Sequence, residues 1–210
     1  MFAELLAHPG VTEELELRSS VGFLAFHGGS LEQGTDDIAR EAARRAGASF
    51  YAVVQPPDLR WHIPSTQFDP AVSPHLRAVL DHVDVAIAVH GFGREGLFTS
   101  LLLGGTNREL ASHVALALRG GLEPHGYAIV DDVDAIPAPL RGQHPDNPVN
   151  RPPAAGVQLE LPPRVRGLGP FWETEDNRAA ARDSGTRTPH TEALIDALAD
   201  AARGWARRTS

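Results

Sequence analysis

The stretch Val21-Gly22-Phe23-Leu24-Ala25-Phe26-His27-Gly28-Gly29 decides how this chain folds. It is an apolar run of strand length that closes on a histidine and two glycines, which is typical of a buried strand ending in a tight turn. A helical pattern over residues 35–46 follows, with Thr35 as the expected N-cap, and a second apolar run covers residues 49–54. Strand, helix and strand in this order predict an α/β fold.

The same alternation continues along most of the chain. Further strands are expected at residues 85–91, 98–103, 127–130 and 156–161, and further helices at 74–83, 106–118 (capped by Thr106) and 191–208. The proline-rich residues 135–155 predict a long surface loop. No linker divides the chain, so we expect a single domain over residues 1–210 with its core at about 15–170, built as an open mixed sheet flanked by helices.

Composition excludes several classes of protein. The chain has 210 residues, no cysteine, and a net charge of −8, and all of its 19 basic residues are arginine. Disulfides, thiolate nucleophiles and Schiff-base lysines are therefore impossible, and nucleic-acid binding is disfavoured. No apolar stretch reaches the roughly 18 to 20 residues of a membrane span, and the N-terminus lacks a signal peptide's basic region. We expect a cytoplasmic protein with no membrane partner.

Polar residues close three of the predicted strands: His27, His90 and Glu160. Strand ends in an open α/β sheet converge on the crevice where ligands usually bind. Glu32 follows His27 by five residues, after a glycine turn. This set suits a metal held by His27, Glu32 and His90, which leaves Glu160 as a general base for a water molecule.

Each of these assignments has an ordinary alternative. Both histidines can be half-buried residues with satisfied ring nitrogens, and Glu160 can face solvent. Asp131 and Asp132 also end a strand and compete for the role of base.

An arginine near the metal could stabilise an oxyanion or bind a substrate carboxylate, and Arg151 is the first choice. The candidate substrate-binding residues are His62, Arg94, Asn150 and Arg164.

Taken together, six motifs resemble the poly-γ-glutamate hydrolase family, which includes the phage-type zinc enzyme and its bacterial relatives. In chain order they are His27-Gly-Gly-Ser-Leu-Glu32-Gln-Gly-Thr35, Trp61-His62-Ile63-Pro64-Ser65-Thr66-Gln67-Phe68-Asp69, Val89-His90-Gly91, Gly104-Gly105, Asn150-Arg151 and Gly156-Val157-Gln158-Leu159-Glu160-Leu161. The resemblance covers about residues 15–170. Two departures are Gln67, where relatives carry a histidine, and Pro152-Pro153, which replace a glycine-rich turn.

The resemblance implies a zinc-carboxypeptidase-like fold and hydrolysis of γ-glutamyl amide bonds. It implies one Zn²⁺ on His27, Glu32 and His90, with Glu160 as the base. The acidic chain would repel a polyanion, so a local patch of arginines (Arg94, Arg108, Arg151 and Arg164) would be needed. Two alternatives remain open: a zinc amidase or deacylase of small acyl-amino acids, and a ligand-binding relative without catalysis.

Overall fold

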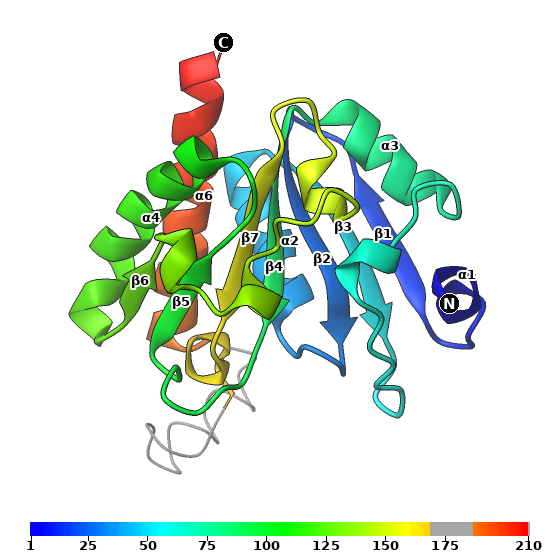
Figure 1. Cartoon of the computed structure of the whole chain (residues 1–210), viewed down its shortest axis with the longest axis horizontal. Helices are drawn as coiled ribbons and strands as arrows, with labels where there is room; N and C mark the ends of the chain where they lie inside the picture. Colours follow the sequence, from blue (N-terminus) through cyan, green and yellow to red (C-terminus); the bar gives the residue numbers. More distant parts are fainter. Residues whose placement is uncertain (169–186, 210) are drawn as a thin grey trace.

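A seven-stranded sheet forms the centre of the computed structural model, which describes residues 1–168 and 187–209 (Figure 1). The strands are β1 (Thr12–Glu16), β2 (Val21–Gly29), β3 (Ser49–Gln55), β4 (Val85–Gly91), β5 (Ser100–Leu103), β6 (Ala128–Val130) and β7 (Gly156–Leu161). Their order in the sheet is β1-β3-β2-β4-β7-β5-β6.

Five α-helices and six short 3₁₀ turns accompany the sheet in the described residues. The helices are α1 (Phe2–Leu6), α2 (Thr35–Ala46), α3 (Pro74–His82), α4 (Arg108–Leu122) and α6 (Pro189–Thr209). The turns are η1 (Ser65–Gln67), η2 (Glu123–His125), η3 (Val133–Ala135), η4 (Ala138–Leu140), η5 (Pro148–Asn150) and η6 (Pro163–Arg166). None of the described helices is long and apolar enough to cross a membrane.

The sheet is mixed, as predicted. Strands β3, β2, β4 and β7 run parallel, whereas β1 is antiparallel to β3 and β5 is antiparallel to β7. The carboxyl ends of β2, β4 and β7 therefore lie at one edge (Figure 1). This arrangement confirms the predicted fold class, a single open α/β domain, and it brings the predicted strand-end residues to the same edge.

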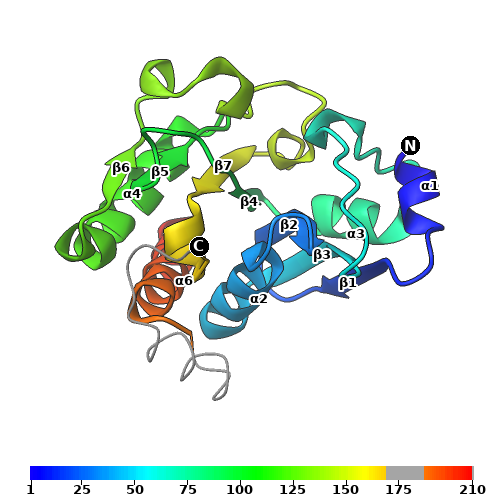
Figure 2. The same ribbon diagram turned by 90° about the horizontal axis from the view of Figure 1, so that it is seen from below.

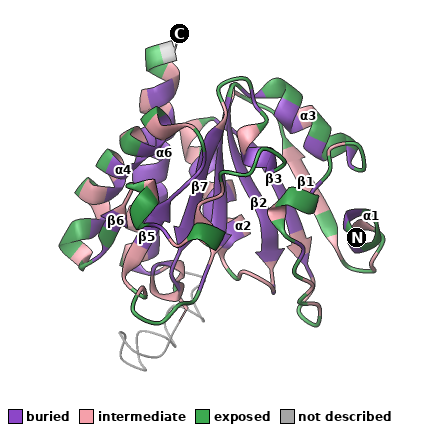
Figure 3. Cartoon of the chain, in the orientation of Figure 1, coloured by how far each residue is buried: buried purple, intermediate pink, exposed green. Residues whose placement is uncertain are grey.

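Alternate residues of the central strands face two separate cores, because successive strand side chains point to opposite faces. Phe23 and Ala25 join the core under α2, α4 and α6, whereas Leu24 and Phe26 join the core under α1 and α3. Figure 2 shows the helices on the two sides of the sheet, and Figure 3 shows the central strands as almost wholly buried. With both faces covered, the chemistry is confined to the edge of the sheet.

Several element boundaries differ from the sequence prediction. Gly34, with φ +85°, is the N-cap of α2, and Thr35 is its first residue. Asn107 rather than Thr106 caps α4, because its side chain accepts a hydrogen bond from the Leu110 amide. The expected loop at 135–155 contains η4 and η5, and α1 and β1 were not predicted. Positions 169 and 170 of the predicted core lie outside the described residues.

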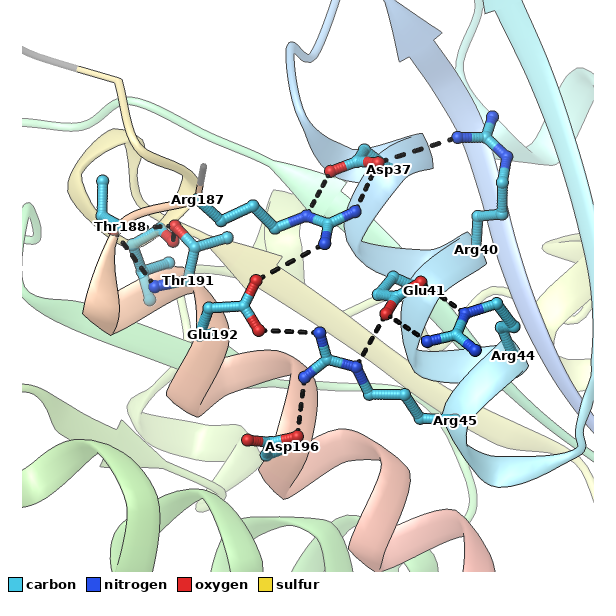
Figure 4. A network of polar contacts seen from close by, with 11 residues as sticks. Asp37, Arg40, Glu41, Arg44, Arg45, Arg187, Thr188, Thr191, Glu192 and Asp196 are labelled. Carbon is cyan, nitrogen blue, oxygen red and sulfur yellow. Dashed lines mark hydrogen bonds and ion pairs between the residues drawn. The ribbon is translucent and has the colours of Figure 1, made fainter. Parts of the chain in front are cut away.

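An ionic network joins α2 to α6 (Figure 4). Arg45 donates to Glu41 at 2.8 Å on its own helix and to Glu192 and Asp196, each at 2.7 Å, on α6. Arg187, just before α6, donates to both carboxylate oxygens of Asp37 at 2.7 and 2.9 Å. Because several charges share partners, this network contributes more to holding α6 in place than isolated surface pairs do.

Substitution of Glu41 by glutamine is expected to destabilise the fold in a pH-dependent way. The hydrogen bonds from Arg44 and Arg45 lower the pKa of Glu41 from 4.5 to about 2. A lowered folded-state pKa stabilises the protein above pH 4.5, and this contribution is lost as the pH falls toward 2. Urea unfolding should show E41Q less stable than wild type by about 1 kcal/mol or less at pH 7, with a smaller difference at pH 3.

The control is E123Q, because among the described residues the Glu123 side chain has only a distant pair with Arg119, at 3.9 Å. Its effect should be close to zero at both pH values. A stability difference for E41Q that does not change between pH 7 and 3 would contradict the role given to this carboxylate.

Candidate metal centre and active site

The turn after β2 brings Glu32 back beside His27. The Glu32 amide donates to the His27 carbonyl at 2.9 Å, and the Gly29 amide donates to Asp36 at 3.0 Å. Gly29 has φ +71°, and a Cβ there would lie 2.1 Å from the carbonyl oxygen of Gln55. Only glycine fits such a position, so the Gly-Gly pair permits the reversal that places a carboxylate next to a strand-end histidine.

The Glu32 carboxylate lies between two buried histidines. Its Oε1 is 2.8 Å from Nδ1 of His27, and its Oε2 is 3.4 Å from Nδ1 of His90. The Gly91 amide also donates to Oε2, at 2.8 Å. Burial by itself would raise the pKa of Glu32, but the two histidines outweigh it and hold that pKa well below its usual range. The carboxylate is therefore ionised at any physiological pH.

The ring of His27 has a fixed orientation. Its Nε2 is 2.7 Å from the carbonyl oxygen of Ile63, which can only accept a hydrogen bond, so Nε2 carries a proton. In the neutral ring, Nδ1 then presents a lone pair to Glu32 Oε1 at only 2.8 Å. Two facing lone pairs require either a second proton on the ring or a cation bound by both atoms. This donor set fits a metal ion such as zinc.

His90 faces the same carboxylate from the end of β4. It is buried, and its ring lies 5.1 Å from that of His27, centroid to centroid. Burial would lower the pKa of His90, but the charge of Glu32 raises it above its usual value. Within the described part of the chain, its Nε2 has no hydrogen-bond partner. Its Nδ1 faces Glu32, and no described residue competes for the ring through a hydrogen bond to Nε2.

His62 is a second candidate for the third metal ligand. Ligand atoms of His27, Glu32 and His62 all lie within 4.8 Å of one another, and the rings of His27 and His62 are 4.9 Å apart. Unlike His90, His62 is exposed. Burial, together with the neighbouring His27, lowers the pKa of His62, so its ring is neutral at pH 7 and can bind a metal or a substrate.

Glu160 lies next to His90 in the sheet, where the two residues are register partners in β7 and β4. It is 4% exposed, and its Oε1 accepts a hydrogen bond from Gln158 Nε2 at 2.8 Å. Burial raises the pKa of Glu160, and although His90 opposes this shift, the charge of Glu32 adds to it. A carboxylate with a raised pKa beside a candidate metal centre is suited to accept a proton and give it back.

These residues open onto one cavity of about 360 Å³. One wall comes from the segment with η1, and the opposite wall comes from residues 138–147. Its lining includes His62, Ser65, Thr66, His144, Asn147 and Gln158. No arginine occurs among the described residues that line this cavity. It therefore presents hydroxyl, amide and imidazole groups to a substrate.

The predicted arginines lie elsewhere. Arg151 lines a different cavity with Asp81 and Asp146, and its guanidinium is 3.8 Å from the latter. Arg94 is exposed in the segment after β4, and Arg164 stacks over the ring of Tyr127 at 4.9 Å. The structure thus gives no support to an oxyanion role for Arg151 or to a patch of these arginines around the metal centre.

Other predicted polar residues have structural contacts instead. The side-chain amide of Asn150 accepts a hydrogen bond from Thr106 and donates to the carbonyl oxygens of Gly142 and His144. It thereby holds the segment that forms one wall of the cavity. Arg108 donates to the carbonyl oxygens of Leu103, Gly104 and Asp131 at the ends of β5 and β6. The two competing carboxylates, Asp131 and Asp132, pair with Arg119 and cap η3, respectively.

Arg166, the last residue of η6, is a charged residue near the site. Its guanidinium donates to the Gln33 carbonyl at 2.8 Å and occupies the space that a Cβ on Gly91 would need. Burial lowers the pKa of Arg166, and the charges of Glu32 and Glu160 oppose that shift. The glycine that follows His90 is thus explained by the guanidinium packed against it.

The sequence pattern of the poly-gamma-glutamate hydrolase family matches residues 2–193, so the chain belongs to this family. It is 33% identical over 114 residues to the SPbeta prophage-derived UPF0714 protein YoqZ of Bacillus subtilis (strain 168), which covers 54% of this chain and 39% of YoqZ. It is 28% identical over 148 residues to the UPF0714 protein YndL of the same strain, and this match covers 70% of this chain and 54% of YndL. The matches thus span about half or less of these relatives' lengths.

Solved structures share the fold. A bacteriophage poly-gamma-glutamate hydrolase superposes with a TM-score of 0.74 at 24% identity, covering 93% of this chain and 89% of that one. The zinc-free apo form of YndL superposes with a TM-score of 0.69 at 22% identity, covering 91% of this chain and 88% of YndL. A putative carboxypeptidase from Burkholderia mallei superposes with a TM-score of 0.53 at 11% identity, covering 96% of this chain and 66% of the carboxypeptidase. The predicted resemblance to this family and to a carboxypeptidase-like fold is confirmed.

Binding of Zn²⁺ to the metal-free protein at pH 7 should release about one proton per ion or more. The proton held between His27 and Glu32 must leave before Nδ1 can bind a cation. Calorimetric titration in two buffers of different ionisation enthalpy measures this release. H125A serves as the control because His125 lies outside the cavity, and it should release as many protons as wild type. Zinc binding without proton release would contradict the geometry assigned to His27.

Proposed function

We propose that this member of the poly-gamma-glutamate hydrolase family is a zinc-dependent amidohydrolase that cleaves γ-glutamyl amide bonds. The observation that carries the proposal is the locked ring of His27, whose Nδ1 faces a carboxylate that stays ionised. Zinc sites for hydrolysis use three protein ligands and leave one position open. His27, Glu32 and His90 supply two nitrogen donors and a carboxylate at the edge of one cavity.

The donor set favours zinc over magnesium or calcium, which prefer oxygen ligands. When bound, zinc would act as a Lewis acid and lower the pKa of a water molecule. The carbonyl of Ile63 holds the His27 tautomer that this requires, and the Gly91 amide holds Glu32 in place. A zinc-free form of YndL is among the solved structures that share the fold, which also makes zinc the first metal to test.

Glu160 would act as the general base and then as the general acid. Its strand places it beside His90, and Gln158 engages its Oε1. The carboxylate would accept a proton from the attacking water and later give it to the departing amine. A raised pKa favours both steps, because it makes the carboxylate a stronger base that holds the proton until the amine departs.

The substrate would lie between the two walls of the cavity. Ser65 and Thr66 offer hydroxyls on one wall, and His144 offers an imidazole on the other. These groups can hydrogen-bond the amide units and carboxylates of a γ-linked glutamate chain. His62, which is exposed and neutral at pH 7, would bind substrate in this arrangement.

Two observations favour a second candidate function, a zinc amidase or deacylase of small acyl-amino acids. The chain carries a net charge of −8, and no arginine occurs among the described lining residues of the cavity. Long-range repulsion would slow the approach of a polyanion more than that of a small substrate. The polymer enzyme should shorten long chains, whereas the small-molecule enzyme should leave them intact.

Substitution of Glu160 by glutamine should leave zinc bound and lower turnover by at least about 10²-fold, the usual contribution of a general base. Turnover is measured as shortening of poly-γ-glutamate or hydrolysis of an acyl-amino acid, with zinc content determined in parallel. D131N is the control, because Asp131 also ends a strand but pairs with Arg119 outside the cavity. Near-normal turnover in E160Q would remove Glu160 from the mechanism.

Substitution of the two candidate third ligands should separate their roles. H90A should lose most of its zinc on dialysis, because the site then keeps only two protein ligands, whereas H62A should retain about one zinc per chain. Elemental analysis of both variants measures this directly. The reverse pattern, with zinc retained in H90A and lost from H62A, would make His62 the ligand and His90 a neighbour.

A further inference from the structure

Gln158 is a buried polar residue whose contacts the proposed reaction does not yet use. It precedes Glu160 by two positions on β7, so the two side chains lie on the same face of the sheet. Both are almost fully buried, with 5% and 4% of their surface exposed. A buried amide in contact with a proposed base either serves that base or braces the fold around it.

Backbone groups set the direction of a hydrogen-bond chain that ends at Glu160. The Val149 amide can only donate, and it donates to Asn147 Oδ1 at 3.3 Å. Nδ2 of Asn147 must therefore face the other way, where it donates to Gln158 Oε1 at 2.7 Å. This contact in turn leaves Nε2 of Gln158 to donate to Glu160 Oε1 at 2.8 Å. Neither the Asn147 amide nor the Gln158 amide can flip without breaking one of these contacts.

The same amide touches the wall of the cavity. Nε2 of Gln158 lies 3.5 Å from the carbonyl oxygen of Leu140. Gly142, with φ +61°, approaches so closely that a Cβ there would lie 2.5 Å from Gln158 Oε1. Residues 138–147 are thus packed on the side chain that also contacts Glu160, and the wall and the base share one support.

We propose that Gln158 is a positioning residue for Glu160, and that Asn147 keeps the Gln158 amide in the orientation that donates to the carboxylate. The inference rests on the proposed function, because it assumes that Glu160 is the base. With Oε1 held by the amide, Oε2 is left to exchange the proton. A flipped amide would instead present its oxygen to the carboxylate and push it away.

Substitution of Gln158 by methionine removes both hydrogen-bonding groups at nearly constant volume. Q158M should lower kcat by about 10- to 100-fold, the usual cost of losing a residue that orients a catalytic group. KM should stay within about threefold, and zinc content should not change. N107A is the stability-matched control, because Asn107 caps α4 and holds the Ala154 carbonyl at the other end of β7. It should lose stability without losing turnover.

A double-mutant cycle separates positioning from general bracing. If Gln158 acts through Glu160, Q158M should have almost no further effect on the residual kcat of E160Q. If Q158M lowers kcat by the same factor in the wild-type and E160Q backgrounds, Gln158 acts independently of the base, and the inference is overturned.

The variant N147D tests whether Asn147, which is not in the hydrogen-bond chain's contact with Glu160, sets the orientation of the Gln158 amide. Aspartate still accepts from the Val149 amide but cannot donate to Gln158, so the Gln158 amide should turn toward it and away from Glu160. A loss of kcat similar to that of Q158M is expected. Full activity would overturn the role of Asn147. If Q158M fails to fold, N147D and its cycle with E160Q carry the test.

The two proposals fail in different ways. Normal turnover in E160Q would contradict the proposed function, whatever Q158M does. An inactive E160Q together with a fully active, folded Q158M would leave the proposed function intact and overturn the positioning role alone.

Discussion

One ionised carboxylate held between two buried histidines determines how the rest of this site is built. Charged groups are costly to bury unless they are paired, and Glu32 is paired on both sides by Nδ1 atoms and from the backbone by the Gly91 amide. The pairing requires parallel β2 and β4 to end at the same edge and a glycine turn to reverse the chain. The two apolar cores that cover the sheet hold these strand ends in position.

The same constraint accounts for the polar groups around the carboxylate. The Ile63 carbonyl orients His27, the guanidinium of Arg166 packs against Gly91, and Gln158 donates to the second buried carboxylate, Glu160. The contacts of Ile63 and Gln158 each orient a group proposed to take part in the reaction, and Arg166 places a positive charge near Glu32 and Glu160. Stability and chemistry therefore depend on the same hydrogen bonds at this edge of the sheet.

Strand periodicity is the reason that much of this site could be predicted from the sequence. His27, His90 and Glu160 each close an apolar run, and such residues meet at one edge once the strands are parallel. The same two-residue period could have identified Gln158, which shares a face with Glu160.

The roles expected of Arg94, Arg151 and Arg164 depend on the paths of irregular segments, which no periodicity encodes. The position of Asn147 and the competition between His62 and His90 depend on such paths as well.

The decisive measurement is the shortening of purified poly-γ-glutamate, followed by size-exclusion chromatography with and without a chelator. We expect that the protein shortens the polymer, that the chelator abolishes this activity, and that added Zn²⁺ restores it. Equal shortening in the presence of the chelator, with zinc shown to be removed, would contradict the proposed metal centre.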